Sequence, residues 1–267
     1  MAWEQKKPLY RPRYPVQALE KALDIIELLS SLKSDKGLGV SEINERLGIG
    51  KSTVHRLLDT LVAYEYVERM ESNRYRLGWG MFEIGSALPR QRKVGSVESN
   101  ILKQVSNSIN ETVNLGVRSG TDVVIVEKRN PEQLSRIRVD FEVGEREPFH
   151  ATALGKLFFS ELDEGVKEEL LRGYHYERLT EHTINTHEAM MEELEKVKNQ
   201  GYAEDREEFS PGIYSVGMPV RGHRGDIVAV ISVRGPAFRF DQEKIKQVLK
   251  ELTKATEELS THLGYRE

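Results

Sequence analysis

The sequence contains no cysteine, and this absence excludes several classes of protein at once. Disulfide-rich secreted folds, thiolate zinc fingers, iron–sulfur proteins and enzymes with a cysteine nucleophile all depend on cysteine. Long apolar runs are lacking as well: the longest is the short segment 227–233, whereas a membrane-spanning helix needs about 18 apolar residues. The first seven residues lack the apolar core of a secretory signal. We expect a soluble, cytoplasmic protein that uses no metal and no cofactor.

The composition is otherwise that of a folded protein, but its charge is unevenly distributed. The 267 residues, 38% of them hydrophobic, allow one large domain or two smaller ones. Although the formal net charge is −4, the first 13 residues carry one acid, Glu4, and four basic side chains, namely Lys6, Lys7, Arg11 and Arg13. A basic N-terminal arm, which we place at residues 1–15, suits a polyanion such as DNA. From charge alone, a solvated tail is an equally good interpretation.

The next segment has the apolar spacing of three helices. From Val16 onward, leucine and isoleucine recur every three or four residues, at Leu19, Leu23, Ile26, Leu29 and Leu32. A two-turn helix is expected at 40–47, then the turn Gly48-Ile49-Gly50, then a helix whose apolar side is Val54, Leu57, Leu58 and Leu61. A short helix, a three-residue turn with glycine and an amphipathic helix are typical of a helix-turn-helix.

The polar side of the third helix indicates DNA as the partner. Its outward side chains are hydroxyls, bases and an imidazole, at Lys51, Ser52, Thr53, His55 and Arg56. No acidic residue occurs from Lys51 to Leu58, although the first turn of a helix favours acids. Hydroxyl and backbone N–H groups bind phosphates, and Arg56 is suited to bind guanine through two hydrogen bonds. The alternative is a plain helical hairpin with no role in DNA binding.

Two short strands are expected after this helix, at 66–70 and 75–77, joined by a tight turn at 71–74. A hairpin directly after such a helix is a wing. Arg74 lies in its turn, where it is placed to contact the DNA backbone or the minor groove. Residues 16–78 are therefore predicted to form a winged helix-turn-helix domain.

The rest of the chain is predicted to consist of a linker helix and an α+β domain. The linker, over 79–95, has an apolar side that ends near Pro89. Beyond it we expect a helix from Val97, strands at 113–118, 123–127 and 136–139, helices at 153–161, 164–171 and 187–199, strands at 214–221 and 227–233, and a terminal helix from Asp241. Hairpins separated from helices indicate an α+β sheet layered with helices, not a doubly wound parallel sheet.

Two short motifs that resemble catalytic signatures fail on spacing. Gly50-Lys51-Ser52 ends like a phosphate-binding P-loop, but the position five residues before Gly50 is Glu45, and a helix precedes the motif instead of a strand. The segment 212–217 has one residue too many for a nucleophile elbow. We therefore assign no catalytic and no metal-binding residue.

Several segments together resemble the IclR family of bacterial transcriptional regulators. They are Ala18–Ile26, Gly50–Leu58, Tyr75–Gly78, His150–Lys156 and Gly201–Phe209, so the resemblance spans the chain from about Val16 to its end. It implies an N-terminal winged helix-turn-helix, a linker helix and a C-terminal effector-binding domain of the profilin/GAF-like type at 96–267. It also implies homodimers formed through the N-terminal region, often paired into homotetramers.

The resemblance further implies where a small effector binds. The matching positions are Ala153, Leu154, Asp205, Ile213, Ser215, Ser232 and Arg234. Where some members of the family have a serine, this chain has Arg234, whose guanidinium suits a carboxylate. We therefore expect an organic acid, such as a keto acid, a sugar acid or an aromatic acid. The alternative is that Arg234 pairs with Asp205, Glu207 or Glu208 and simply closes the fold.

The residues and the resemblance together predict a ligand-controlled transcription factor, either a repressor or an activator. Two recognition helices of a dimer would face successive major grooves, which implies a pseudo-palindromic operator in double-stranded DNA. Two rival functions stay open. One is an enzyme acting on a small carboxylate with an appended DNA-binding domain, and the other is an interaction module whose winged helix binds protein.

Overall fold

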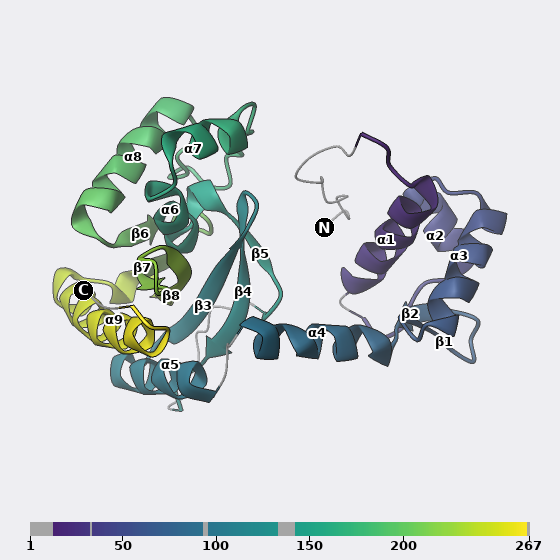
Figure 1. Ribbon diagram of the computed structural model, residues 1–267, viewed down its shortest axis with the longest axis horizontal. Helices are drawn as coiled ribbons and strands as arrows, with labels where there is room; N and C mark the ends of the chain where they lie inside the picture. Colours follow the sequence, from purple (N-terminus) through teal and green to yellow (C-terminus); the bar gives the residue numbers. More distant parts are fainter. Residues whose placement is uncertain (1–12, 33, 93–95, 133–141, 266–267) are drawn as a thin grey trace. The chain divides into compact units, whose positions relative to one another are not determined.

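The computed structural model describes residues 13–32, 34–92, 96–132 and 142–265 (Figure 1). The chain divides into two compact units, Met1–Val94 and Gly95–Glu267, and each has a hydrophobic core of its own. Within the described ranges, no helix is both long and apolar enough to cross a membrane. Most of the basic arm expected at 1–15 lies outside these ranges.

The N-terminal unit is a winged helix-turn-helix, as predicted. It consists of α1 (Gln17–Ser30), α2 (Val40–Leu47), α3 (Lys51–Ala63), the antiparallel strands β1 (Val67–Arg69) and β2 (Tyr75–Leu77), and α4 (Trp79–Arg92). The core joins Ile25 and Leu28 of α1 to Val54 and Leu58 of α3. Gly48 ends α2 with a φ of +67°, a conformation that glycine adopts without strain, and so turns the chain into α3.

Two details of this unit differ from the predicted pattern. Leu19 and Leu23 belong to the apolar repeat of α1, yet they are 58% and 50% exposed, because the small core reaches only the second half of this helix. The linker helix predicted over 79–95 is α4, which ends at Arg92 and continues past Pro89, where its apolar side was expected to end. A proline removes only one backbone hydrogen bond within a helix, and this loss does not terminate α4.

The C-terminal unit is built on one antiparallel six-stranded sheet, in the order β5-β4-β3-β8-β7-β6. The strands are β3 (Thr112–Ser119), β4 (Asp122–Arg129), β5 (Arg146–Pro148), β6 (Ala203–Arg206), β7 (Ile213–Arg221) and β8 (Ile227–Pro236). This arrangement confirms the α+β prediction. The strand expected at 136–139 lies outside the described residues.

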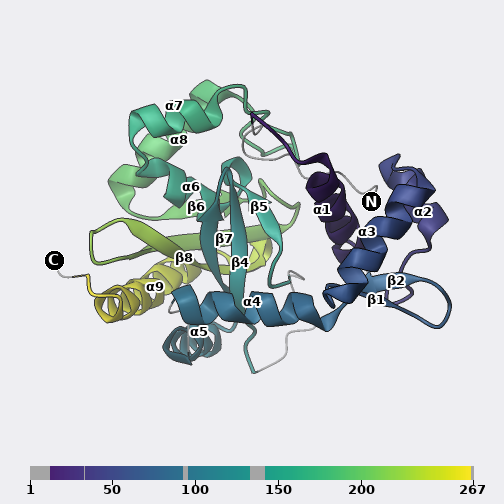
Figure 2. The ribbon, with the colours of Figure 1, turned by 45° about the vertical axis from the view of Figure 1, so that its right-hand side comes forward.

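Helices cover both faces of this sheet (Figure 1; Figure 2). On one face lie α5 (Ser96–Ile109) and α9 (Gln242–His262), which also contact each other. On the other face lies α6 (Ala153–Ser160), with α7 (Glu164–Leu171) and α8 (His187–Gln200) outside it. All eight residues of α6 are buried, and its start is held close to the preceding short 3-10 helix Phe149–Ala151. A Cβ at Gly155 would lie 2.2 Å from the Phe149 backbone, so this approach requires glycine.

Candidate functional site

The outward side of α3 presents its polar side chains to solvent. Lys51, Ser52, His55 and Arg56 are exposed, and Thr53 is half-buried. In the part of the chain that the structure describes, these five side chains form no hydrogen bond and no ion pair. The first turn of α3 contains no acid. The surface therefore offers only donors, hydroxyls and an imidazole to a partner, with no carboxylate in the first turn to repel a phosphate.

The position of this surface is fixed by the turn before it. The Asn44 side chain donates a hydrogen bond to the Ile49 backbone oxygen at 2.8 Å, which holds the connection between α2 and α3. Val54 and Leu58 anchor the opposite side of α3 in the core with no exposed area. The polar side is therefore displayed by a rigid element and not by a loop.

Arg74 does not extend freely from the wing. Its Nε donates to the Lys36 backbone oxygen at 2.9 Å, and its Nη2 donates to the Gly37 oxygen at 2.9 Å and to Glu42 at 3.0 Å. Glu42 in turn accepts a bond from the Gly39 backbone N–H, and these hydrogen bonds, first Gly39 and then Arg74, lower its pKa. The guanidinium is thus engaged inside the unit, a correction to the open position expected for it, and a contact with DNA would require it to leave these partners.

In the C-terminal unit, polar side chains gather on the face of the sheet that α6 covers. Pairing places Asp205 of β6 opposite Ser215 of β7, and Ser215 opposite Arg234 of β8. Ser232, two positions before Arg234, lies on the same face and pairs with Asn114 of β3. A face packed against a buried helix would ordinarily be apolar, so this concentration of polar groups needs a separate explanation.

Five buried residues at this place keep polar atoms without a hydrogen-bond partner in the described chain. We call them the polar cluster: Asn114, Asp205, Glu208, Ser215 and Ser232. Both side-chain polar atoms of Asn114 are unpartnered, as are both serine hydroxyls and one carboxylate oxygen of each acid. Leaving such groups unsatisfied costs about 1–3 kcal/mol each, so native proteins rarely do so without a function.

Four of the seven positions expected for an effector lie on neighbouring strands of this face, namely Asp205, Ser215, Ser232 and Arg234. Ile213 opens β7 on the same side, while Ala153 and Leu154 begin α6, which covers it. Sequence reasoning missed Asn114 and Glu208. The alternation of polar Thr112, Asn114 and Gly116 with apolar neighbours along β3 is a signal that identifies Asn114.

Arg234 forms an ion pair with Glu147, a partner that was not predicted from the sequence. Its two terminal nitrogens bind the two carboxylate oxygens of Glu147 at 2.5 and 2.9 Å, and both side chains are 1% exposed. The guanidinium also lies 5.8 Å from the centre of the Phe209 ring. The buried ion pair of the alternative interpretation does exist, but it is formed with Glu147, whereas Asp205 interacts with Arg234 through its charge. Glu147 lies on β5, at the edge of the sheet farthest from β6.

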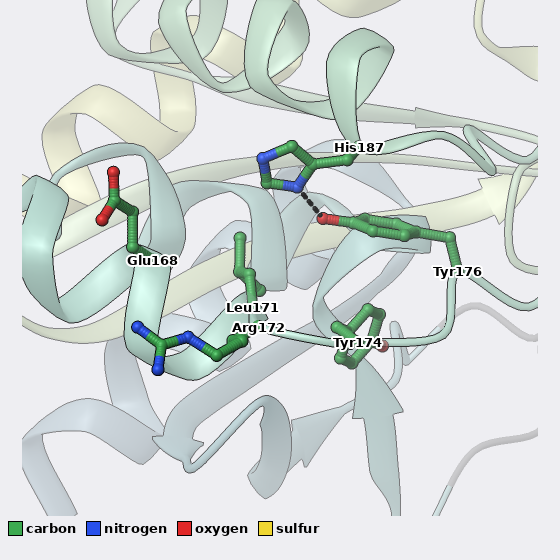
Figure 3. A pocket seen from close by; sticks show the side chains of 7 residues that line it. Glu168, Leu171, Arg172, Tyr174, Tyr176 and His187 are labelled. Atoms are coloured by element: carbon green, nitrogen blue, oxygen red, sulfur yellow. Dashed lines mark hydrogen bonds between the residues drawn. The ribbon is translucent and has the colours of Figure 1, made fainter.

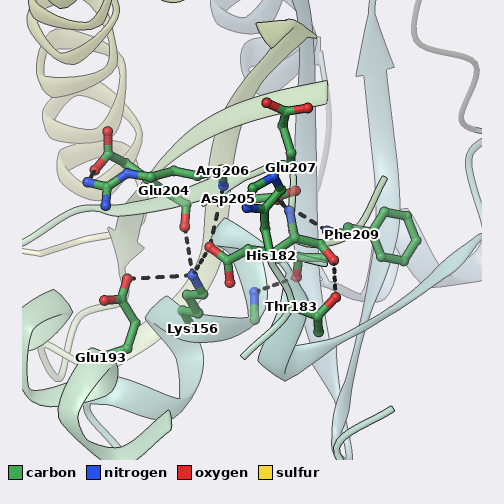
Figure 4. A network of polar contacts seen from close by, with 12 residues as sticks. Lys156, His182, Thr183, Glu193, Glu204, Asp205, Arg206, Glu207 and Phe209 are labelled. Atoms are coloured by element: carbon green, nitrogen blue, oxygen red, sulfur yellow. Dashed lines mark hydrogen bonds and ion pairs between the residues drawn. The ribbon is translucent and has the colours of Figure 1, made fainter. Parts of the chain in front are cut away.

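A second buried cation holds the other side of the polar cluster (Figure 4). Lys156 of α6, with no exposed side-chain area, donates to Glu208 at 2.6 Å and to the Glu204 backbone oxygen at 2.9 Å. It also lies 3.5 Å from Glu193 of α8. The Glu208 backbone N–H then donates to Asp205 at 2.8 Å. This chain of bonds ties α6 and α8 to the strand that carries Asp205.

Asp205, one of the two acids of the polar cluster, has a pKa far above its ordinary value. Burial raises its pKa to about 7, Arg234 opposes this shift, and Glu208 adds to it. An acid that is partly protonated near pH 7 both donates and accepts hydrogen bonds. Within the described residues, no group of three or more histidines or acids is arranged to hold a metal ion.

Comparison with known families matches both units. A family model described as the C-terminal part of the bacterial transcriptional regulator IclR covers residues 88–261, and a model described as the IclR helix-turn-helix domain covers residues 18–71. The HTH-type transcriptional regulator XynR of Escherichia coli is 34% identical over 256 residues, which span 94% of this chain and 98% of XynR. KdgR of the same organism is 30% identical over 252 residues, spanning 94% and 95%.

Solved structures agree with these sequence matches. The crystal structure of the Thermotoga maritima IclR superimposes with a TM-score of 0.74 at 30% identity, covering 93% of this chain and 99% of that one. An IclR transcriptional regulator from Alicyclobacillus acidocaldarius superimposes with a TM-score of 0.81 at 26% identity, covering 94% and 100%. With its helix-turn-helix and effector-binding units both matched, the chain belongs to the IclR family of bacterial transcriptional regulators.

Proposed function

We propose that this regulator binds a pseudo-palindromic operator through Lys51, Ser52, Thr53, His55 and Arg56 of α3. The observation that supports this interface is the set of exposed donors on α3 that have no partner within the described chain. Arg56 recognises guanine, and Lys51 and the arm at 1–15 bind phosphates. Arg74 supports the interface by holding the wing against α2. The protein acts in the cytoplasm as a regulator and not as an enzyme, in keeping with its named relatives.

The regulator acts as a homodimer or homotetramer, and exposed apolar side chains support this part of the proposal. Trp79, Phe82 and Ile84 of α4 are 75%, 68% and 53% exposed, and Leu19 and Leu23 of α1 are also exposed. An apolar surface of this kind is typical of a protein–protein interface. Two α3 helices in one dimer would then contact two half-sites of the operator.

The effector site is the polar cluster, and its ligand is a small organic acid. The observation that carries this proposal is the set of buried polar atoms that lack partners at Asn114, Ser215, Ser232, Asp205 and Glu208. The amide and hydroxyl donors suit the oxygens of an acid, and the two carboxylate oxygens suit its hydroxyl groups. Because Glu147 already binds Arg234, the carboxylate of the effector shares or replaces that contact.

The effector site is tested with a thermal-unfolding screen of keto, sugar and aromatic acids, followed by titration calorimetry on the acid that stabilises the protein most. Ser232→Ala removes one unpartnered hydroxyl, so binding should weaken about tenfold, which corresponds to one hydrogen bond of about 1.4 kcal/mol. Ser160→Ala is the matched control, because Ser160 is equally buried but donates to the Leu157 oxygen outside the cluster. Equal affinity of Ser232→Ala and wild type would disprove the site.

The DNA interface is tested with operator fragments selected from random sequence and compared with nonspecific DNA. Arg56→Ala should lose about 1–3 kcal/mol of discrimination, because the hydrogen bonds to guanine disappear. Arg56→Lys retains the charge but not the two-pronged geometry, so it should lose discrimination and keep nonspecific affinity. Unchanged discrimination in both variants would remove Arg56 from the interface.

A further inference from the structure

A pocket of about 420 Å³ lies apart from the polar cluster, between the end of α7 and the start of α8 (Figure 3). Its main lining residues are Glu168, Leu171, Arg172, Tyr174, Tyr176 and His187, none of which belongs to the polar cluster. Its size falls in the range of pockets that hold small molecules, about 300–1,000 Å³. Nothing in the proposed regulation by the polar cluster uses this pocket.

Two tyrosines and a histidine form the aromatic part of this pocket. The rings of Tyr174 and Tyr176 are 5.0 Å apart in an edge-to-face arrangement, and the Tyr176 ring is 6.1 Å from that of His187. A hydrogen bond of 2.9 Å joins the Tyr176 hydroxyl to Nδ1 of His187 and holds both rings. Figure 3 shows the other ring nitrogen of His187 turned toward the side of the pocket where Glu168 lies. Flat aromatic surfaces bind planar rings through stacked and edge contacts.

The opposite side of the pocket carries one cation and one anion. Arg172 follows the last turn of α7, is exposed, and has no partner among the described residues. Glu168, one turn earlier, is likewise exposed and unpaired in the described chain. Figure 3 shows both side chains on the α7 side of the pocket, with the Arg172 guanidinium extended away from Tyr174 toward the side where Glu168 lies. An exposed guanidinium on one side of a pocket whose other side is aromatic is suited to the carboxylate of a planar molecule.

The floor of the pocket connects to the start of α6. The Nε2 of His150 lies 2.9 Å from the Glu177 backbone oxygen, which only accepts, so Nε2 carries the proton. Nδ1 therefore accepts from the Tyr174 hydroxyl at 3.0 Å. Burial lowers the pKa of His150, which favours this neutral form. His150 lies two residues before Thr152, the residue that caps α6, so a hydrogen bond joins Tyr174 to the segment that leads into the helix covering the polar cluster.

We propose that this pocket is a second ligand site, which takes a small aromatic carboxylate. The ring lies against Tyr174 and Tyr176, and the carboxylate faces Arg172. Glu168 lowers the affinity for anions and so limits the site to ligands with a single acidic group held on the Arg172 side. Binding of this ligand to the pocket does not depend on the proposed function. Any effect of the ligand on DNA binding does rest on it.

The test uses the full chain and three probes in titration calorimetry: benzoate, its neutral counterpart benzamide, and the non-aromatic cyclohexanecarboxylate. Benzoate should bind at least tenfold more tightly than either of the others. Arg172→Gln should weaken benzoate at least tenfold, whereas Glu168→Gln should strengthen it, because a like charge is removed. Both side chains are exposed, so neither change threatens folding. Arg178→Gln is the matched control, since Arg178 is exposed but does not line the pocket.

A second comparison separates this site from the polar cluster. Ser232→Ala should leave benzoate binding unchanged, while Tyr176→Ala should abolish it in a protein whose thermal unfolding is otherwise retained. The proposal is overturned if benzoate does not bind at millimolar concentration, or if the Arg172 and Glu168 variants bind it as wild type does. It is also overturned if Ser232→Ala removes binding, a result that would place benzoate in the polar cluster and leave the proposed function intact.

Discussion

The polar side of α3 and the polar cluster of the C-terminal unit are organised in opposite ways. On α3, the unpartnered groups lie in solvent, where water satisfies them until a partner arrives. In the polar cluster, the unpartnered groups are buried, and two enclosed cations, Lys156 and Arg234, hold the surrounding acids in place. Under the proposed function, one chain therefore uses exposed charge to bind DNA and enclosed polar groups to bind a small effector.

The physical reason for this difference lies in the size of each proposed partner. DNA offers many phosphates, and a protein gains affinity from it by displacing counterions with exposed bases, so enclosure is unnecessary. A small acid offers only a few atoms, and each hydrogen bond must therefore act in a medium of low dielectric constant to contribute enough. The ion pairs follow the same division: the Arg74 and Glu42 side chains are 35% and 42% exposed, whereas those of Arg234 and Glu147 are 1% exposed.

The strongest test of this contrast between exposed and buried ion pairs is Lys156→Met. The variant roughly keeps the length of the side chain but removes its charge. Glu208, whose side chain is 7% exposed, would lose its cation in a buried environment. We expect the free energy of unfolding to fall by about 3–5 kcal/mol, measured by urea denaturation. Replacing Glu208 by Gln in the same chain should restore part of this loss, because the unpaired charge is then gone.

Lys196→Met is the matched control for this prediction. Lys196 lies 3.5 Å from Glu193, the same acid that Lys156 approaches, but its side chain is 46% exposed. An exposed pair of this kind contributes at most about 1 kcal/mol. If the two lysine variants lost equal stability, burial would not be what distinguishes the ion pairs of the two regions.

Much of the fold could be predicted because apolar periodicity survives in the sequence. The helix expected at 40–47 is α2, and the strand pair of the wing is close to its predicted bounds. The strands β5 and β6 could not be predicted, since Arg146 and Glu147, and likewise Glu204 and Asp205, are charged side chains in a position where a strand is usually apolar. Their burial depends on partners that are distant in the sequence.

For the candidate sites too, the sequence predicts local features but not contacts between distant residues. The polar side of α3 was predictable, because it depends only on the periodicity of one helix. The residues of the effector site came from resemblance to the family, and that route did not identify the partner of Arg234. Glu147 is 87 positions away in the sequence and belongs to an unpredicted strand. Local patterns do not contain such a contact, because it arises only when the sheet is assembled.

The next largest effect concerns the pH dependence of stability through Asp205. Its pKa of about 7 lies above the ordinary value of 3.8, so the folded chain keeps a proton that the unfolded chain releases. Stability contributed by this group is therefore complete below about pH 4 and is lost as the pH rises to 7, by at most about 1.4 kcal/mol per pH unit. Asp205→Asn, which cannot ionise, should show a flatter decline in urea denaturation between pH 4.5 and 8. Parallel curves for the variant and wild type would contradict the enclosure of this carboxyl.

A smaller loss of stability is expected when the buried N-cap of α6 is compared with the exposed N-cap of α8. Thr152 caps the buried helix α6 by accepting from the Gly155 N–H at 3.1 Å, and Thr186 caps the exposed start of α8 by accepting from the Ala189 N–H at 3.3 Å. Replacing an N-cap threonine by alanine costs about 0.5–2 kcal/mol. Thr152→Ala should lie near the upper value and Thr186→Ala near the lower, because water replaces the lost bond only at Thr186. Equal losses in thermal unfolding would show that burial does not strengthen the cap.

The smallest effect is expected for Arg74→Ala, at the exposed ion pair of the N-terminal unit. Loss of the contact to Glu42 and to two backbone oxygens should destabilise the start of α2 by less than about 1 kcal/mol, and added salt should reduce this difference. Hydrogen exchange of the α2 amides measures the loss locally. Because the guanidinium is already engaged, the salt dependence of DNA affinity should be the same in the variant as in wild type. A decrease of the salt slope by about 1 would instead show that Arg74 leaves its partners and binds a phosphate.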